Sequence, residues 1–183
     1  MDTSVYYTKV DDEIVPILDN GYTTFQNAGQ TTKKGFEFVG DYEVIKWLRL
    51  GSSFAYSDYE YDDFTELVDG VPVDRSGNRM PYVPRQQYSL FADYRHPNGF
   101  SARVQANSWG SYYMDTANTE KYTGYNFVTD VALSYETGPH TLSFNVQNLF
   151  DKRYAMEVKK DTHKKYYSAA SPQAYMLTYS YAL

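Results

Sequence analysis

The stretch QYSLFADYRHPNGFSARVQANS, residues 87–108, decides the fold that this sequence predicts. In each half, apolar residues alternate with polar ones, which is typical of a β-strand whose two faces meet different surroundings. The link HPNG (His96–Gly99) between the halves is short and rich in turn formers. The stretch therefore predicts two consecutive strands that run in opposite directions.

The same period of two recurs along the chain from Gly35 to the C-terminus. Two weaker runs precede it, at Val5–Lys9 and Ile14–Gln26, with a short link at Asp11–Glu13 between them. About nine strands in series leave almost no room for helix. The predicted class is all-β, with antiparallel strands. The other clear runs begin near Gly35, Leu48, Tyr125, Thr141 and Ala174.

The polar faces of these strands favour a membrane barrel over a soluble sandwich. A sandwich buries its apolar faces in a shared core and leaves a charged face in water. Here the polar face is mainly Ser, Asn, Gln, Thr, Ala and Gly, which suits the wall of a wide, hydrated or plugged lumen. A few charges interrupt that face, and we expect them to point inward: Glu37, Asp93, Arg103 and Asp130.

The links between strands alternate in length. We expect the short links, at Glu43–Lys46, His96–Gly99 and Thr137–Pro139, at one end of the strands. The long links, at Asp62–Pro84, Gly110–Gly124 and Asp151–Ser171, then lie at the other end. Outer-membrane barrels have short periplasmic turns and long extracellular loops, so the long links should face outward.

Aromatic residues gather near both ends of the strands, as membrane interfaces favour. One predicted girdle consists of Trp47, Tyr94, Phe100, Tyr135 and Tyr181. The other consists of Tyr59, Tyr61, Tyr82, Trp109, Tyr112, Tyr125 and Phe150.

Composition excludes several classes of protein. The 183 residues carry a net charge of −6, include no Cys and have 21 Tyr. Disulfide frameworks and Cys-ligated metal sites are therefore excluded, and an acidic chain is not expected to bind nucleic acid. The sequence contains no run of about 18 apolar residues, so it predicts no transmembrane helix. The first residues lack the pattern of an export signal.

The sequence contains no GxGxxG, P-loop, HExxH or GxSxG motif, so we expect no enzyme, no cofactor and no metal site. His163 lies in the last long link and is interpreted as a solvated loop residue. The acidic stretch Asp58–Gly70 lacks the ligand spacing of an EF-hand. The basic cluster Lys159–Lys165, followed by two tyrosines, either holds an anionic aromatic ligand or is a solvated loop.

The segment VQNLFDKRY (Val146–Tyr154) resembles the C-terminal signature of TonB-dependent outer-membrane receptors. The segments Phe25–Phe38 and Met80–Gln87 are similar to two further elements of that family. The resemblance implies strands of a 22-stranded barrel in the bacterial outer membrane, plugged by an N-terminal domain. Residues 1–183 would then be the C-terminal portion of such a barrel, without the plug. The final residue is Leu183, where the family usually has an aromatic residue.

The resemblance also implies a function. It predicts TonB-dependent uptake of a scarce metal chelate, with a ferric siderophore as the leading expectation. The implied partners are outer-membrane lipid, the plug domain and TonB. The inward charges could meet the plug, although pairing within the wall is favoured. The expected ligand contacts at the outer rim are Tyr112, Tyr113, Tyr122, Arg153, Tyr154, Lys164, Tyr166 and Tyr167.

Two other classes stay open. A self-contained small outer-membrane barrel, acting as an adhesin or a hydrolase, would have to close with the strands of this chain alone. A hydrolase would also need a carboxylate near His163. A soluble β-sandwich binding module is disfavoured by the apolar face on every strand.

Overall fold

A computed structural model describes residues 1–19, 21–161 and 164–182; His163 and Leu183 lie outside these ranges. The described residues form one eight-stranded antiparallel sheet and three two-stranded sheets, and they include no helix. In particular, no described helix is long and apolar enough to cross a membrane. The all-β prediction is confirmed.

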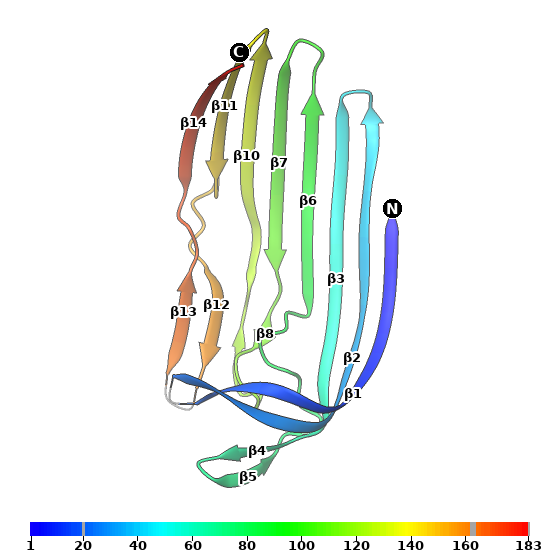
Figure 1. Cartoon of the computed structure of the whole chain (residues 1–183), viewed down its shortest axis with the longest axis vertical. Coiled ribbons are helices and arrows are strands. Elements are labelled where there is room, and N and C mark those ends of the chain that lie inside the picture. Colours follow the sequence, from blue (N-terminus) through cyan, green and yellow to red (C-terminus); the bar gives the residue numbers. More distant parts are fainter. Residues whose placement is uncertain (20, 162–163, 183) are drawn as a thin grey trace.

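The large sheet has the strand order β1-β2-β3-β6-β7-β10-β11-β14 (Figure 1). Each of the three long links predicted from the sequence contains one of the small hairpins, β4–β5, β8–β9 or β12–β13. The bounds are β1 Asp2–Asp19, β2 Tyr22–Ile45, β3 Leu48–Asp63, β4 Thr65–Val68, β5 Val71–Asp74, β6 Gln86–Arg95, β7 Phe100–Trp109, β8 Tyr112–Tyr113, β9 Lys121–Tyr122, β10 Tyr125–Thr137, β11 His140–Gln147, β12 Ala155–Lys160, β13 Lys165–Ala169 and β14 Ala174–Tyr181.

The two ends of the sheet differ as the link lengths predict. The short turns after β2, β6 and β10 lie at one end, near the C-terminus, whereas all three small hairpins lie at the other end (Figure 1). We call the end with the hairpins the mouth. The alternation of short and long links is confirmed from β2 onward.

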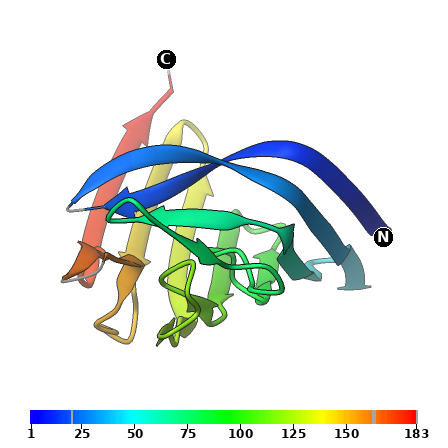
Figure 2. The ribbon, with the colours of Figure 1, turned by 90° about the horizontal axis from the view of Figure 1, so that it is seen from below.

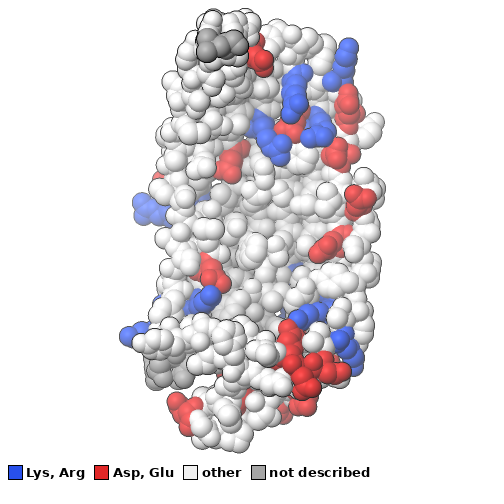
Figure 3. Space-filling view, viewed as in Figure 1, with Lys and Arg blue, Asp and Glu red and all other residues white. Residues whose placement is uncertain are grey.

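The strand register carries the apolar residues across the sheet in continuous rows. Val131 lies opposite Val104 on one side and Val146 on the other, and Leu50 lies between Tyr42 and Ala92. Because side chains alternate between faces, one face of the sheet is apolar and the other is mainly polar. The sheet curves (Figure 2), and the polar face lies on its hollow side, where Figure 3 shows charged side chains. The large apolar side chains exposed on the convex side include Phe36, Tyr42, Leu50, Leu90, Val104, Leu142, Phe144 and Leu177.

The N-terminal part differs from the prediction. Asp11–Glu13 is not a link, because β1 runs through it and pairs with β2 in one register, Asp11 opposite Gln30 and Glu13 opposite Ala28. Asp12 has a φ of 55°, which is a local backbone irregularity within the strand and not a turn. The run Val5–Lys9 and the first part of the run Ile14–Gln26 therefore belong to one strand, β1, whereas the end of that run, from Tyr22, belongs to β2. The large sheet has eight strands among the described residues, not nine.

The sheet is open in the described residues: β1 pairs only with β2, and β14 pairs only with β11. A self-contained small barrel would need these two edges to pair. The structure therefore gives no support to closure by this chain alone.

One aromatic girdle is confirmed and the other is not. At the end away from the mouth, the Trp47 and His96 rings lie 5.0 Å apart beside Tyr94. At the mouth, Tyr61 and Tyr112 are buried inside hydrophobic clusters, so they cannot face lipid. Tyr88 and Phe127, whose rings lie 5.6 Å apart, take the convex positions there. The sequence pattern predicted aromatic residues near the strand ends, but it could not show which of their rings the loops would cover.

Candidate functional site

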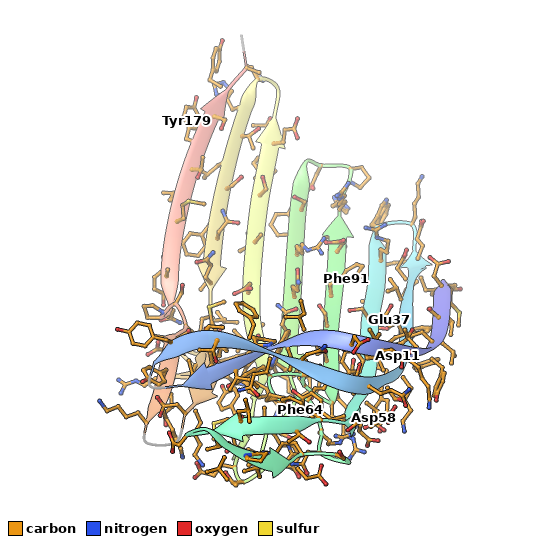
Figure 4. The ribbon with its side chains drawn as sticks, turned by 60° about the horizontal axis from the view of Figure 1, so that its bottom comes forward. Asp11, Glu37, Asp58, Phe64, Phe91 and Tyr179 are labelled. Carbon is orange, nitrogen blue, oxygen red and sulfur yellow. The ribbon has the colours of Figure 1, made fainter. Side chains whose placement is uncertain are left out.

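The β1–β2 hairpin bends over the mouth and crosses it (Figures 2 and 4). Val15 and Ile17 of the hairpin are buried in a cluster with Tyr61, near the end of β3, and Phe64, directly after it. Burying such apolar side chains stabilises each by roughly 1.5–3 kcal/mol, which favours the crossing position. The Gln26 side chain also accepts a hydrogen bond from the Leu67 N–H at 2.9 Å and donates one to the Leu67 carbonyl at 3.2 Å.

Under this hairpin lies a cavity of about 270 Å³, which we call the mouth cavity. Charged groups of its lining pair with each other: Glu66 accepts a hydrogen bond from Arg75 at 2.6 Å, and the Lys160 ammonium lies 3.2 Å from Asp115. Glu66 also accepts a hydrogen bond from the Thr116 hydroxyl at 2.8 Å. The sequence did not predict this cavity, because it forms from four segments far apart in the chain. Its lining includes Pro16–Leu18, Glu66, Arg75, Tyr82, Asp115–Ala117, Thr119, Lys160 and Asp161.

Tyr82 is the aromatic side chain in the lining of the mouth cavity. Burial, together with the carboxylates of Asp115 and Glu157, raises the pKa of Tyr82 to about 12. The phenol therefore stays protonated at neutral pH and can act as a hydrogen-bond donor. The ammonium of Lys159 lies 5.8 Å from the centre of the Tyr82 ring.

The hairpins β8–β9 and β12–β13 are held together by ion pairs. The Lys160 ammonium lies 3.2 Å from Asp115 and 3.1 Å from Glu120, and the Lys165 ammonium lies 3.0 Å from Glu120. Part of the basic cluster Lys159–Lys165 is therefore structural. Hydrogen bonds from Lys165 and Lys160 lower the pKa of the Glu120 carboxyl.

The structure places the eight predicted ligand contacts in different surroundings. Tyr112 is buried and bonded to Val158, and the Tyr122 hydroxyl donates to the Ala155 carbonyl at 2.6 Å, so both hold loops together. Tyr113 packs beside Lys121, whose ammonium lies 4.5 Å from the ring centre. A contact between Tyr112 and a ligand would require the loops to separate.

The other five predicted contacts lie on or next to the β12–β13 hairpin. Tyr154 packs against Tyr125 with ring centres 4.4 Å apart, and Arg153 and Lys164 are exposed. The Tyr166 hydroxyl donates to Asp161 at 2.9 Å. Tyr167 is 66% exposed, which leaves its ring open to a ligand.

A second cavity, of about 370 Å³, lies on the concave wall near the mouth. It combines the amides of Gln87 and Asn107 with the rings of Trp109 and Tyr125. A few polar groups among aromatic rings are typical of ligand sites.

At the opposite end the concave wall is charged (Figure 3). The Asp93 carboxylate accepts hydrogen bonds from Arg103 at 3.1 Å and from Arg49 at 3.4 Å. Both guanidiniums also lie over the ring of Phe91, labelled in Figure 4, at 4.9 and 5.7 Å. The predicted pairing within the wall is confirmed for Arg103 and Asp93. Asp130 likewise has a partner in the chain, the Asn148 N–H at 2.8 Å.

Within residues 1–19, 21–161 and 164–182, no group of three or more His, Cys, Asp or Glu side chains is arranged to hold a metal ion. The groups at the mouth offer hydrogen bonds, aromatic rings and cations. Such groups are suited to non-covalent binding of a ligand.

A curved antiparallel sheet with an apolar convex face, a polar hollow and long hairpins at one end is the wall of a transmembrane β-barrel. Residues 1–149 match the family model described as "TonB dependent receptor-like, beta-barrel". The chain belongs to this family of bacterial outer-membrane β-barrel proteins.

Relatives and solved structures agree. The chain is 29% identical over 137 residues to the probable TonB-dependent siderophore receptor PiuA of Acinetobacter baumannii, covering 72% of this chain and 18% of that protein. It is 27% identical over 134 residues to the metal-pseudopaline receptor CntO of Pseudomonas aeruginosa, covering 70% of this chain and 18% of that protein.

The crystal structure of PiuA matches with a TM-score of 0.79 at 26% identity, over 98% of this chain and 25% of that chain. The ferric yersiniabactin uptake receptor FyuA of Yersinia pestis has a TM-score of 0.78 at 21% identity, over 99% and 27%, which shows a shared fold. The chain thus spans about a quarter or less of the length of PiuA and CntO.

Proposed function

We propose that this chain is the C-terminal portion of the barrel of a receptor that takes up a metal chelate, with a ferric siderophore as its ligand. An N-terminal plug and TonB would be the partners of the complete receptor, and the mouth would face the cell exterior. The observation that carries the proposal is the pair of cavities at and near the mouth, since each combines at least one aromatic ring with hydrogen-bonding groups. Binding and passage would make and break no covalent bond.

The names of the relatives support the same class of ligand. PiuA is described as a siderophore receptor and CntO as a metal-pseudopaline receptor. Siderophore chelates are commonly anionic and often aromatic, so exposed rings and cations suit them. Within this chain we propose that ligand contacts come from Arg153, Tyr154, Lys164, Tyr166 and Tyr167.

Uptake of radioactive iron tests the proposal. Cells that depend on the complete receptor for a given chelate should accumulate iron only while TonB is functional. We expect Tyr167→Ala together with Lys164→Gln to weaken chelate binding about tenfold. Tyr42→Ala, which removes a ring from the convex face, is the matched control and should leave binding unchanged.

Uptake that is indifferent to TonB, or absent for every ferric chelate offered, would contradict the proposal. If the Tyr167→Ala and Lys164→Gln double variant bound the chelate as tightly as the Tyr42→Ala control, the assignment of these two residues as ligand contacts would be wrong.

A further inference from the structure

A cluster of cations lies on the convex face of the sheet, at the edge of its apolar band. Lys34 of β2 lies opposite Asp58 of β3, one step along the same face from the apolar pair Phe36 and Tyr56. Because side chains of one face repeat every second residue, Lys34 and Asp58 point to the same side as those rings. They therefore lie on the outside of the barrel wall and not in its lumen.

Three cations surround the single carboxylate of Asp58. The Lys34 ammonium lies 3.3 Å from it, Arg79 forms an ion pair with it, and a guanidinium nitrogen of Arg85 lies 3.9 Å away. The Asp58 side chain is only 10% exposed, whereas those of Lys34 and Arg85 are 47% and 51% exposed. Glu60 is the next carboxylate on the same strand face. Even when Glu60 is included, the three cations outnumber the two carboxylates, so the group as a whole keeps a positive charge.

The Arg85 guanidinium is fixed against the apolar band. Its Nε donates to the Tyr56 hydroxyl at 3.2 Å, and its carbon lies 5.7 Å from the centre of the Tyr56 ring. Three cations crowd around one carboxylate, and burial together with the nearby charge of Arg85 lowers the pKa of Arg79. An added anion would relieve this crowding.

The position along the strand corresponds to a lipid headgroup layer. On β3 the convex residues Leu48, Leu50, Phe54 and Tyr56 form the apolar band, interrupted only by Ser52, and Trp47 lies at its far end. A transmembrane β-strand crosses the hydrocarbon core with about 9–11 residues. Asp58 and Lys34 come directly after that length, where aromatic rings give way to charged groups.

A small cavity of about 90 Å³ opens beside Arg79 and Arg85. Its lining also includes the hydroxyl-bearing residues Ser111 and Tyr113 and a further cation, Lys121. Several cations and hydroxyl donors around a small space match the oxygens of a phosphate group.

We propose that Lys34, Arg79 and Arg85 bind the phosphate of an anionic lipid headgroup in the outer leaflet. The site joins this side of the barrel to the membrane through charge as well as through the apolar band. The proposal rests on the proposed orientation of the mouth toward the cell exterior, and it does not depend on which chelate the receptor takes up.

The test uses the purified complete receptor in neutral detergent, titrated with short-chain phosphatidic acid, short-chain phosphatidylcholine or inorganic phosphate. We expect phosphatidic acid to bind, phosphatidylcholine not to bind, and Arg79→Gln with Arg85→Gln to weaken binding at least tenfold. Affinity should fall steeply with added salt. Arg95→Gln removes an exposed arginine at the other end of the sheet and should leave the affinity unchanged.

Unchanged binding in the Arg79→Gln and Arg85→Gln double variant would overturn the site. Inorganic phosphate that binds as tightly as phosphatidic acid would overturn its assignment to lipid. Should the double variant fail to fold, Lys34→Gln alone removes a half-exposed cation and should weaken binding about threefold; no change would count against the site. A receptor that binds phosphatidic acid but takes up no chelate would contradict only the proposed function.

Discussion

The hydroxyl of Tyr112 accepts a hydrogen bond from the backbone N–H of Val158 at 2.7 Å and donates one to the Val158 carbonyl at 3.1 Å. The two residues belong to different hairpins at the mouth, and both are buried. One side chain thus replaces the backbone partner that an adjacent strand would offer. These two hydrogen bonds explain why two long links pack as one layer.

Replacing Tyr112 by Phe should loosen that layer. The change keeps the ring but leaves the buried N–H and carbonyl of Val158 unpaired, which costs roughly 1–3 kcal/mol. Hydrogen exchange should quicken over Ala155–Lys160 while the large sheet stays protected. Tyr167→Phe removes a hydroxyl from an exposed ring and serves as the control. Equal exchange in both variants would count against the role of the Tyr112 hydroxyl.

Gly99 should tolerate no side chain. Its φ is +90°, and a Cβ there would fall 1.9 Å from the carbonyl oxygen of Glu136 on β10. Gly99→Ala should therefore destabilise the barrel by roughly 3–5 kcal/mol, the sum of backbone strain and overpacking. Gly138 also has a positive φ, +54°, but a Cβ there would meet no atom within 4 Å. Gly138→Ala should cost only about 1–2 kcal/mol in denaturant unfolding, and similar costs for the two variants would contradict the clash.

The contact between β8–β9 and β12–β13 should depend on pH. The pKa of Glu120 is lowered in the folded chain. Its contribution to the stability of this contact is therefore fully present above the usual pKa of a glutamate and is lost as the pH falls through the lowered pKa. Burial alone would lower the pKa of Lys160, but hydrogen bonds with Glu120 and Asp115 raise it overall. The contribution of Lys160 is therefore present below its usual pKa and is lost as the pH rises through the raised one.

The contact should consequently be constant from about pH 5 to pH 10 and weaken on either side. Limited proteolysis at the Lys159–Lys165 cluster, with a protease active across the range, measures it. Glu120→Gln should remove the acidic transition. A rate of cleavage that changes steadily between pH 6 and pH 9 would contradict this assignment.

Within the charged cluster on the concave wall, we expect substitution of Asp93 to cause the largest loss of folding stability. Asp93→Asn leaves Arg49 and Arg103 without their shared carboxylate. Because both guanidiniums are about half exposed, solvent reduces the cost to about 1–2 kcal/mol. Thermal unfolding of the receptor measures the loss, and Arg95→Gln is the control. No difference between the two variants would mean that the cluster adds no stability.

The isolated chain should not close into a barrel. Its edge strands β1 and β14 have no second partner among the described residues, and unpaired backbone groups in lipid cost several kcal/mol each. After refolding in detergent, its mobility in SDS gels should be the same with and without boiling. A compact, faster band before boiling would show closure and would revive the small-barrel alternative.

The strands, their faces and the two different ends could be predicted from the sequence. A period of two is a local property, so Tyr88 to Tyr94 alternates wherever the strand is placed, and the short link at His96–Gly99 fixes the neighbour of that strand. The inward pairing of Arg103 with Asp93 follows from the same alternation, since the two residues lie opposite each other.

Only the tertiary structure decided how the mouth is built. Val15 packs on Phe64, and Tyr112 bonds to Val158, across separations that no local period encodes. For the same reason the sequence divided β1 at Asp11–Glu13, although pairing with β2 keeps it continuous, and it assigned to lipid the rings that the loops bury. The sequence by itself determined a membrane-barrel wall, because alternation is local; the cavities and the cation cluster depend on which distant segments meet.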